Sequence, residues 1–242
     1  MQIKYYPEPE NIMAVKELIA QCALTDNIQY DISPDNIDEP DSVCIVVLNE
    51  DNSASAFAIA YIMDSEIEIT GLVHPEFRRQ GIFSSIIDSI RAKYLKPVVL
   101  FGKKNYPNFN EFCSALGFNS LEEECLMKYE GQLPQDFEKM YFETEGDASY
   151  TAYFYNENDE HVGYLNVSES ENCSTIHDVF IFDELRGMGY GKRMMQTILS
   201  DIAKRNKYAI LHVSKSNKIA YHIYKSLGMN EISSIIYRKT GD

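Results

Sequence analysis

The chain has little positive charge for its length of 242 residues. Its 22 Lys and Arg residues are outnumbered by 37 Asp and Glu residues, which gives a net charge of -15 at pH 7. Because nucleic acid is bound by basic surfaces, this balance predicts that the protein has no nucleic-acid partner. The acidic charge could help to attract a cationic substrate such as an amine, or it could serve solubility alone.

The chain also lacks a long apolar run, and it has few cysteines. No segment approaches the roughly 20 apolar residues of a membrane-spanning helix, and the opening MQIKYYPEPE is unlike a secretory signal. The five cysteines are odd in number and show no CxxC or Cys/His ligand spacing, which indicates free thiols rather than disulfides or a zinc site. We therefore expect a cytoplasmic protein with no membrane contact and no metal.

The apolar pattern predicts the same order of elements twice. The first half is expected to form a helix over 9–24, strands over 43–48, 54–63 and 66–73, a helix after Arg78, a strand over 97–101, a helix around 110–116 and a strand around 122–129. The second half is expected to form strands over 150–155, 162–168 and 175–182, a helix over 189–205, a strand over 208–213, a helix over 218–226 and a strand over 231–238.

Matching landmarks support an internal repeat. Arg78 and Arg186 lie 108 residues apart, and Gly117 and Gly228 lie 111 apart. We therefore predict a first repeat at 1–130 and a second repeat at 131–242, each an α/β (α+β) domain with a mixed, mainly antiparallel sheet flanked by helices. The second repeat has no counterpart of the first helix, and 132–145 is expected to be a connecting segment with at most one short helix.

A glycine-rich turn precedes the first helix of the second repeat. In ELRGMGYGKRMMQTIL, three alternate glycines follow Arg186 and stand just where the helix begins. A helix N-terminus has unpaired N–H groups that bind phosphate when no side chain blocks the approach. The turn therefore indicates a pyrophosphate site, although glycines that only shape and pack the turn would give the same pattern. It is not a P-loop, because Arg193 follows Gly191 and Lys192.

A second motif follows in VSKSNKIAYHIYKSLGM, with Asn217, Ala220, Tyr224 and Gly228 on a strand–helix–strand segment. Together, R-G-x-G-x-G and N-x-x-A-x-x-I-Y-x-x-x-G-M resemble the GNAT superfamily of N-acetyltransferases. The resemblance covers nearly the whole chain as two tandem copies, and the second copy is the closer one. It implies acetyl-CoA, or another acyl-CoA, as the acyl donor and direct transfer to an amine, on a small molecule or a peptide, in a ternary complex.

The resemblance also implies roles for residues of the second repeat. Pantetheine would lie where the strand before the turn parts from its neighbour, held by main-chain groups near Val179 and Ile181. Asn217 would bond the pantetheine arm, and Tyr224 would protonate the leaving thiolate. The pyrophosphate would lie on the turn formed by Arg186, Gly187, Met188, Gly189, Tyr190, Gly191 and Lys192. Asn217 could instead be only a helix N-cap, and Tyr224 only a core residue.

The general base is not identified by a motif. Deprotonating an ammonium requires a carboxylate, a histidine or a water chain in the acceptor cleft. Glu171, His177, Asp178 and His212 are candidates, whereas His222 is expected on a helix surface. Because His177 and Asp178 are neighbours in a predicted strand, we expect their side chains to point to opposite faces.

The first repeat departs from the pattern. It keeps Arg78 and Gly81, but Phe83 replaces the last glycine, and Tyr106 and Cys113 stand where the second repeat has Asn217 and Tyr224. We therefore predict that the second repeat carries catalysis. The first repeat is predicted to be degenerate, and either structural or part of the acceptor cleft, with weak binding of CoA left open. Cys113 is expected to be a small core residue rather than a nucleophile. The alternative to an enzyme is a non-catalytic CoA-binding sensor or scaffold. No pattern identifies the acceptor or the oligomeric state.

Overall fold

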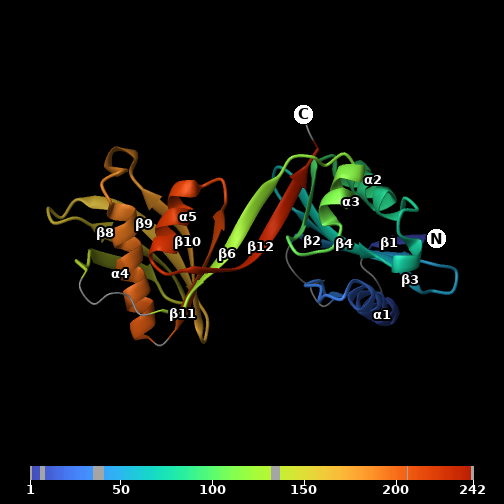
Figure 1. Ribbon diagram of the computed structural model, residues 1–242, viewed down its shortest axis with the longest axis horizontal. Helices are drawn as coiled ribbons and strands as arrows, with labels where there is room; N and C mark the ends of the chain where they lie inside the picture. The colour runs from blue at the N-terminus through green and yellow to red at the C-terminus, as the bar shows by residue number, and fades with distance from the viewer. Residues whose placement is uncertain (1, 6–8, 35–40, 132–136, 206, 241–242) are drawn as a thin grey trace. The chain divides into compact units, whose positions relative to one another are not determined.

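A computed structural model of the chain describes all residues except 1, 6–8, 35–40, 132–136, 206 and 241–242. Tertiary contacts divide the chain into two compact units (Figure 1). Unit 1 comprises residues 1–121 and 236–242, and unit 2 comprises residues 122–235. Among the residues described, no helix is both long and apolar enough to cross a membrane.

Unit 1 is a twisted sheet with helices on both faces. Its strands are ordered β1-β2-β3-β4-β5, followed by the end of β12 (Asn230–Lys239). The other elements are β1 (Gln2–Tyr5), α1 (Pro9–Asp26), β2 (Ser42–Leu48), β3 (Ala54–Ile62), β4 (Ile67–Val73), η2 (Pro75–Phe77), α2 (Ile82–Tyr94), β5 (Val98–Lys103) and α3 (Phe109–Ala115).

Two apolar layers hold unit 1 together. On one face, Val15, Leu18 and Cys22 of α1 pack against inward residues of β2 and β3. On the other face, an apolar stripe of α2 that includes Ile86 and Ile90 packs against the alternate residues of the same strands. Because both faces of β2 are covered, all seven of its residues are buried.

Unit 2 has the strand order β6-β11-β10-β9-β8-β7, with the beginning of β12 next to β6. Only β10 and β11 pair in parallel among the register pairs described for this unit. Its elements are β6 (Glu122–Tyr129), β7 (Tyr141–Gly146), β8 (Ser149–Tyr155), β9 (His161–Glu169), β10 (Cys173–Ile181), η3 (Asp183–Leu185), α4 (Tyr190–Lys204), β11 (Tyr208–Ser214) and α5 (Lys218–Ser226). Both helices contribute to a single core on one face of the sheet.

The compact units do not coincide with the two sequence repeats. The last strand of the first repeat, β6, pairs antiparallel with β11 of unit 2. The last strand of the second repeat, β12, ends next to β5 in unit 1. Residues 122–130 therefore fold with the second repeat, and residues 236–240 fold with the first. A sequence repeat cannot reveal such an exchange, because equivalent strands carry equivalent apolar patterns.

The prediction for residues 132–145 is wrong where the structure describes it. Tyr141–Gly146 forms strand β7, which pairs antiparallel with β8, while residues 132–136 lie outside the described part of the chain. Five of the six residues of β7 are exposed, so this edge strand lacks the apolar alternation that would have predicted it.

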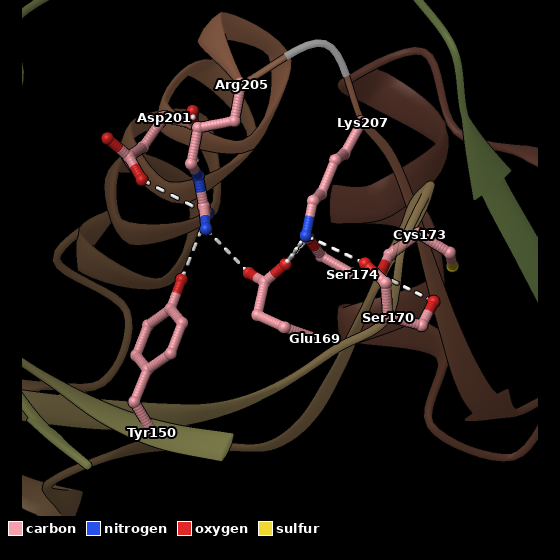
Figure 2. A network of polar contacts seen from close by, with 8 residues as sticks. All are labelled: Tyr150, Glu169, Ser170, Cys173, Ser174, Asp201, Arg205 and Lys207. Carbon is pink, nitrogen blue, oxygen red and sulfur yellow. Dashed lines mark hydrogen bonds and ion pairs between the residues drawn. The ribbon is translucent and has the colours of Figure 1, made fainter. Parts of the chain in front are cut away.

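A polar network closes one end of the unit 2 sheet (Figure 2). The Glu169 carboxylate at the end of β9 lies 2.6 Å from a guanidinium nitrogen of Arg205 and 2.6 Å from Nζ of Lys207, and it accepts a hydrogen bond of 3.0 Å from Ser174 Oγ. Arg205 also donates to the Tyr150 hydroxyl at 3.1 Å. Burial would raise the pKa of Glu169, but the hydrogen bonds from Lys207, Ser174 and Arg205 together lower it. The network ties the chain after α4 to the β9–β10 hairpin.

Candidate functional site

Strands β10 and β11 part in the middle of β10. Their parallel pairing runs from Cys173 opposite Tyr208 to Ile176 opposite Leu211, although both strands continue beyond these pairs. From His177 onward β10 leaves β11, and its pairing with β9 shifts register between His177 and Phe180. Residues 177–181, including Val179 and Ile181, therefore have no described partner on β11, and the Ile181 carbonyl accepts a hydrogen bond from Nε of Arg186 instead.

The glycine turn lies directly after the open part of β10. Gly187 and Gly189 adopt φ angles of 80° and 85°, and Gly189 is the N-cap of α4. These left-handed conformations explain two of the three glycines, because a side chain would strain them. A Cβ built at either position meets no atom within 4 Å, so open space lies beside the turn at both glycines. Met188 is 61% exposed, and Lys192 is also exposed.

Neither backbone conformation nor close packing requires the third glycine, Gly191. It lies inside α4 without a positive φ, and a Cβ there would lie 3.8 Å from Ile181 and 3.9 Å from Ile223, which are ordinary contacts. Arg186 is exposed and held by its own turn, where its guanidinium lies 2.8 Å from Asp183 and its Nε donates to the carbonyl of Ile181. Its charge therefore remains beside the helix N-terminus.

The second motif lies on α5. The Asn217 side chain accepts a hydrogen bond of 3.2 Å from the Ala220 amide and caps the helix, which confirms the N-cap prediction. Tyr224 is 7% exposed and belongs to the core of unit 2, and its hydroxyl makes no hydrogen bond with any residue that the structure describes. Burial raises the pKa of Tyr224 to about 12. The phenol is therefore protonated at neutral pH.

His177 and Asp178 do not point to opposite faces, and our expectation about them is wrong. Asp178 adopts a left-handed conformation with φ of 52°, which breaks the alternation of the strand. Its Oδ2 lies 2.9 Å from Nδ1 of His177 and accepts a hydrogen bond of 2.9 Å from the Asn166 amide. Nε2 of His177 lies 3.1 Å from Ser168 Oγ. The two hydrogen bonds to Asp178, from His177 and from Asn166, lower its pKa.

This geometry orients the imidazole. An ionised carboxylate can only accept, so Nδ1 of His177 carries the proton that bonds to Asp178, and Nε2 of the neutral ring is the basic nitrogen. Ser168 can donate its hydroxyl proton to Nε2. Sequence reasoning missed Asn166 and Ser168, because only the register of the β9–β10 hairpin brings them beside His177.

The comparisons with known proteins agree with this arrangement. Residues 116–229 match the sequence model of the Acetyltransferase (GNAT) family. This match marks residues 116–229 as a GNAT acetyltransferase domain. The matched residues include the parted strands, the glycine turn and the whole of α5.

The likeness of fold extends over both repeats. The chain is similar to a GCN5-related N-acetyltransferase from Sphaerobacter thermophilus, with a TM-score of 0.72 and 16% identity over 98% of this chain and 94% of that one. It is similar to a tandem GNAT protein from the clavulanic acid biosynthesis pathway, with a TM-score of 0.64 and 11% identity over 100% and 99% of the two chains. It is also similar to a glucosamine N-acetyltransferase region of a fungal GH3 beta-N-acetylglucosaminidase, with a TM-score of 0.69 and 13% identity over 98% of this chain and 38% of that one.

At these identities the likeness shows the fold, which is that of two tandem GNAT-like units. No match was found among curated proteins.

The other two base candidates, Glu171 and His212, lie in different places. Glu171 is exposed in the turn between β9 and β10, at the closed end of the sheet. His212 lies on β11 with its Nδ1 at 3.6 Å from Glu124, and His222 bonds the Lys218 carbonyl on its own helix. His212 follows directly after Leu211 of the last β10–β11 pair, so it also lies at the opening. Of the four candidates, only His177 and Asp178 contact each other there.

One group of potential metal ligands is described, and it forms an ion-pair cluster. Glu123, Cys125 and Glu231 bring their ligand atoms within 4.8 Å of one another. Nζ of Lys215 lies 2.6 Å from Glu231 and 3.8 Å from Glu123, so a cation already balances these carboxylates. This contact lowers the pKa of Glu231 to about 2.

Unit 1 has a turn before α2 whose backbone conformation resembles that of the glycine turn before α4. Gly81 caps α2 with φ of 77°, and Arg79 adopts φ of 61° where the second repeat has Gly187. Strands β4 and β5 also pair only from Ile67 to Ile69, and a cavity of about 730 Å³ lies beyond that point, lined by residues of β4, β5, α2 and α3. Arg78, however, is bound by both carboxylate oxygens of Asp26 at 2.8 and 2.6 Å.

The side chains of this cavity differ from those of unit 2. The Phe83 ring packs edge-on against Phe112, and the Tyr106 hydroxyl accepts a hydrogen bond from the Asp31 amide. Cys113 is fully buried in the core, as predicted, and desolvation raises its pKa to about 12. A thiol with this pKa is not a thiolate at neutral pH, so it does not serve as a nucleophile.

Proposed function

We propose that the protein transfers an acetyl group from acetyl-CoA to a primary amine directly in a ternary complex, and that the second repeat carries the reaction. The observation that supports this most is the order of features along one strand. Three features follow one another from the N-terminus of α4 back along β10 toward its last pair with β11. They are the glycine turn, the main chain at Ile181 and Val179 that has no partner on β11, and the His177–Asp178 pair.

This order matches the parts of the donor. The pyrophosphate would bind the amides of Gly187 to Lys192 at the N-terminus of α4, with Arg186 adding charge. Pantetheine would lie along the unpaired edge of β10 at Val179 and Ile181, with Asn217 reaching its arm. Acetyl-CoA supplies the acetyl group as a thioester whose sulfur leaves as a thiolate.

The thioester would then lie beside His177. In the transfer, a bond forms between the amine nitrogen and the carbonyl carbon, the carbon–sulfur bond breaks, and the amine proton passes to Nε2 of His177. Asp178 holds the imidazole in the required tautomer, and a main-chain amide of the opened strand stabilises the charge that develops on the carbonyl oxygen.

Tyr224 would act on the leaving sulfur. Its pKa of about 12 is well above the roughly 8.5 of a free thiol, so it is a weak acid toward a thiolate. We propose that its hydroxyl stabilises the thiolate chiefly by donating a hydrogen bond. A phenol without another partner among the described residues is free to do so.

The test is to measure the release of CoA thiol from acetyl-CoA against a panel of primary amines, together with thermal stabilisation by CoA. Turnover with an amine and stabilisation by CoA are expected. Stabilisation without turnover on any acceptor would instead favour a CoA-binding sensor. The absence of stabilisation would contradict both forms of CoA binding.

A further inference from the structure

One face of the unit 2 sheet carries side chains that the core does not use. Buried residues of β8 and β9, including Phe154 and Leu165, point toward α4 and α5. The residues that alternate with them point to the opposite face. In unit 1 the corresponding face is covered by α1, whereas the two helices described in unit 2 both lie on the core side.

This opposite face is aromatic. Strand register places Glu143, Tyr153, Tyr164 and Phe180 in one row across β7, β8, β9 and β10. The Tyr164 and Phe180 rings stack with centroids 5.3 Å apart, and Tyr153 lies 6.4 Å from Tyr164. We call the aromatic face the set formed by Tyr141, Tyr153, Tyr155, His161, Tyr164, Phe180 and Phe182.

The aromatic face carries uncompensated negative charge along its outer strand. Glu143 accepts hydrogen bonds from Tyr141 at 2.8 Å and Tyr155 at 3.4 Å, and Glu145 accepts one from Tyr153 at 3.1 Å. These hydroxyl donors carry no positive charge, so they do not balance the two carboxylates. Within the described part of the chain, neither forms an ion pair with Lys or Arg.

The rings also accept a cation. The Arg186 guanidinium lies over the Phe180 ring, with its carbon 5.7 Å from the ring centroid. Aromatic faces attract cations through the ring quadrupole, and more strongly when the site is partly shielded from water. The overall charge of -15 favours the approach of the same class of ligand.

We propose that the aromatic face binds the acceptor amine, and that this acceptor is a linear aliphatic polyamine. The proposal rests on the function proposed above. The carboxylates lie on β7 and the His177–Asp178 pair on β10, three strand spacings away, or roughly 14 Å. An acceptor that contacts both the carboxylates and the His177–Asp178 pair must carry a second ammonium far from its reacting nitrogen. The methylene groups between the two nitrogens would then pack on the rings of the aromatic face. A lysine side chain on a peptide is too short to do this with its single ammonium.

The first test is direct binding, which does not depend on turnover. Titration calorimetry with spermine, 1,4-diaminobutane and butylamine should show the tightest binding for spermine. The double substitution Glu143→Gln with Glu145→Gln, and separately Tyr153→Leu, should each weaken spermine binding at least tenfold. The matched control is Glu130→Gln with Glu171→Gln, which removes two exposed charges away from the aromatic face and should leave the affinity almost unchanged.

The second test is kinetic. With acetyl-CoA, the Glu143→Gln and Glu145→Gln variant should raise KM for spermine at least tenfold, while kcat and the KM for butylamine stay close to wild type. Three results would overturn the proposal. They are equal affinity for spermine in wild type and variant, an equal loss of spermine affinity in the control variant, and tighter binding of butylamine than of spermine. Spermine binding on the aromatic face without any acetyl transfer would overturn the proposed function and this acceptor role, whereas transfer to amines without such binding would overturn this inference alone.

Discussion

Nδ1 of His177 and Oδ2 of Asp178 lie 2.9 Å apart, although the two residues are neighbours in a strand. The contact exists because Asp178 adopts φ of 52° where β10 leaves β11 and shifts its register with β9. A strained residue held by its surroundings often marks a functional site. Here the strain points the carboxylate at the imidazole and makes Nε2 the basic nitrogen.

The first prediction concerns this pair. His177→Gln should lower kcat about 100-fold at neutral pH, because the acceptor ammonium loses its general base. The loss should shrink as the pH rises toward the pKa of an alkyl amine, about 10.4, where the amine deprotonates without help. The measurement is kcat/KM against pH for wild type and variant. A variant with an unchanged profile would show that His177 is not the base.

Tyr224 gives the second prediction. Tyr224→Phe keeps the buried ring, so the thermal midpoint should move little, but kcat should fall about tenfold or more because the leaving thiolate loses a hydrogen bond. The KM for acetyl-CoA should change less than kcat. Tyr221→Phe is the control on the same helix, since its hydroxyl bonds Glu231 at 3.2 Å. Equal losses of kcat in both variants would argue against a specific role for Tyr224.

The third prediction compares the two turns. Gly189→Ala and Gly81→Ala both place a Cβ on a left-handed N-cap with open space around it, so each should destabilise the protein by about 1 kcal/mol. Only Gly189→Ala should weaken CoA binding and largely abolish acetyl transfer. Urea unfolding and CoA titration separate the two effects. If Gly81→Ala alone were inactive, the second repeat would not carry the reaction.

The fourth prediction concerns stability and pH through Glu169. Its pKa is lowered in the folded protein, so the ionised carboxylate contributes stability above its ordinary pKa of about 4.5, and this contribution is lost as the pH falls through the lower folded value. Glu169→Gln should therefore lower the free energy of unfolding by about 2 kcal/mol at pH 7, because Arg205 and Lys207 lose their partner.

The difference between wild type and Glu169→Gln should shrink steadily below pH 4.5. Urea unfolding at pH 7, 4.5 and 3 measures it. Glu171→Gln, at an exposed position two residues away, should have almost no effect at any of these pH values. If Glu169→Gln lowered the free energy of unfolding by the same amount at every pH, packing of the side chain rather than its charge would stabilise the network.

The sequence by itself was sufficient for the motifs of the second repeat and for the order of the elements other than β7. Apolar periodicity predicted each of the paired elements from α2 to β6 and from β8 to β12 because every one buries a face. The glycines predicted a turn just before α4, and the structure shows Gly187 and Gly189 there in left-handed conformations. Asn217 stood at the position of a helix cap, and it caps α5.

Only the tertiary structure decided how these elements combine. Strand β7 is exposed at an edge, so its pairing with β8 rather than burial makes it a strand. The sequence does not reveal that β6 and the end of β12 each join the sheet of the other repeat, because equivalent strands have equivalent apolar patterns. The His177–Asp178 contact and the rows of the aromatic face depend on hairpin register and on a bulge. Register depends on hydrogen bonds between distant segments, which local periodicity does not encode.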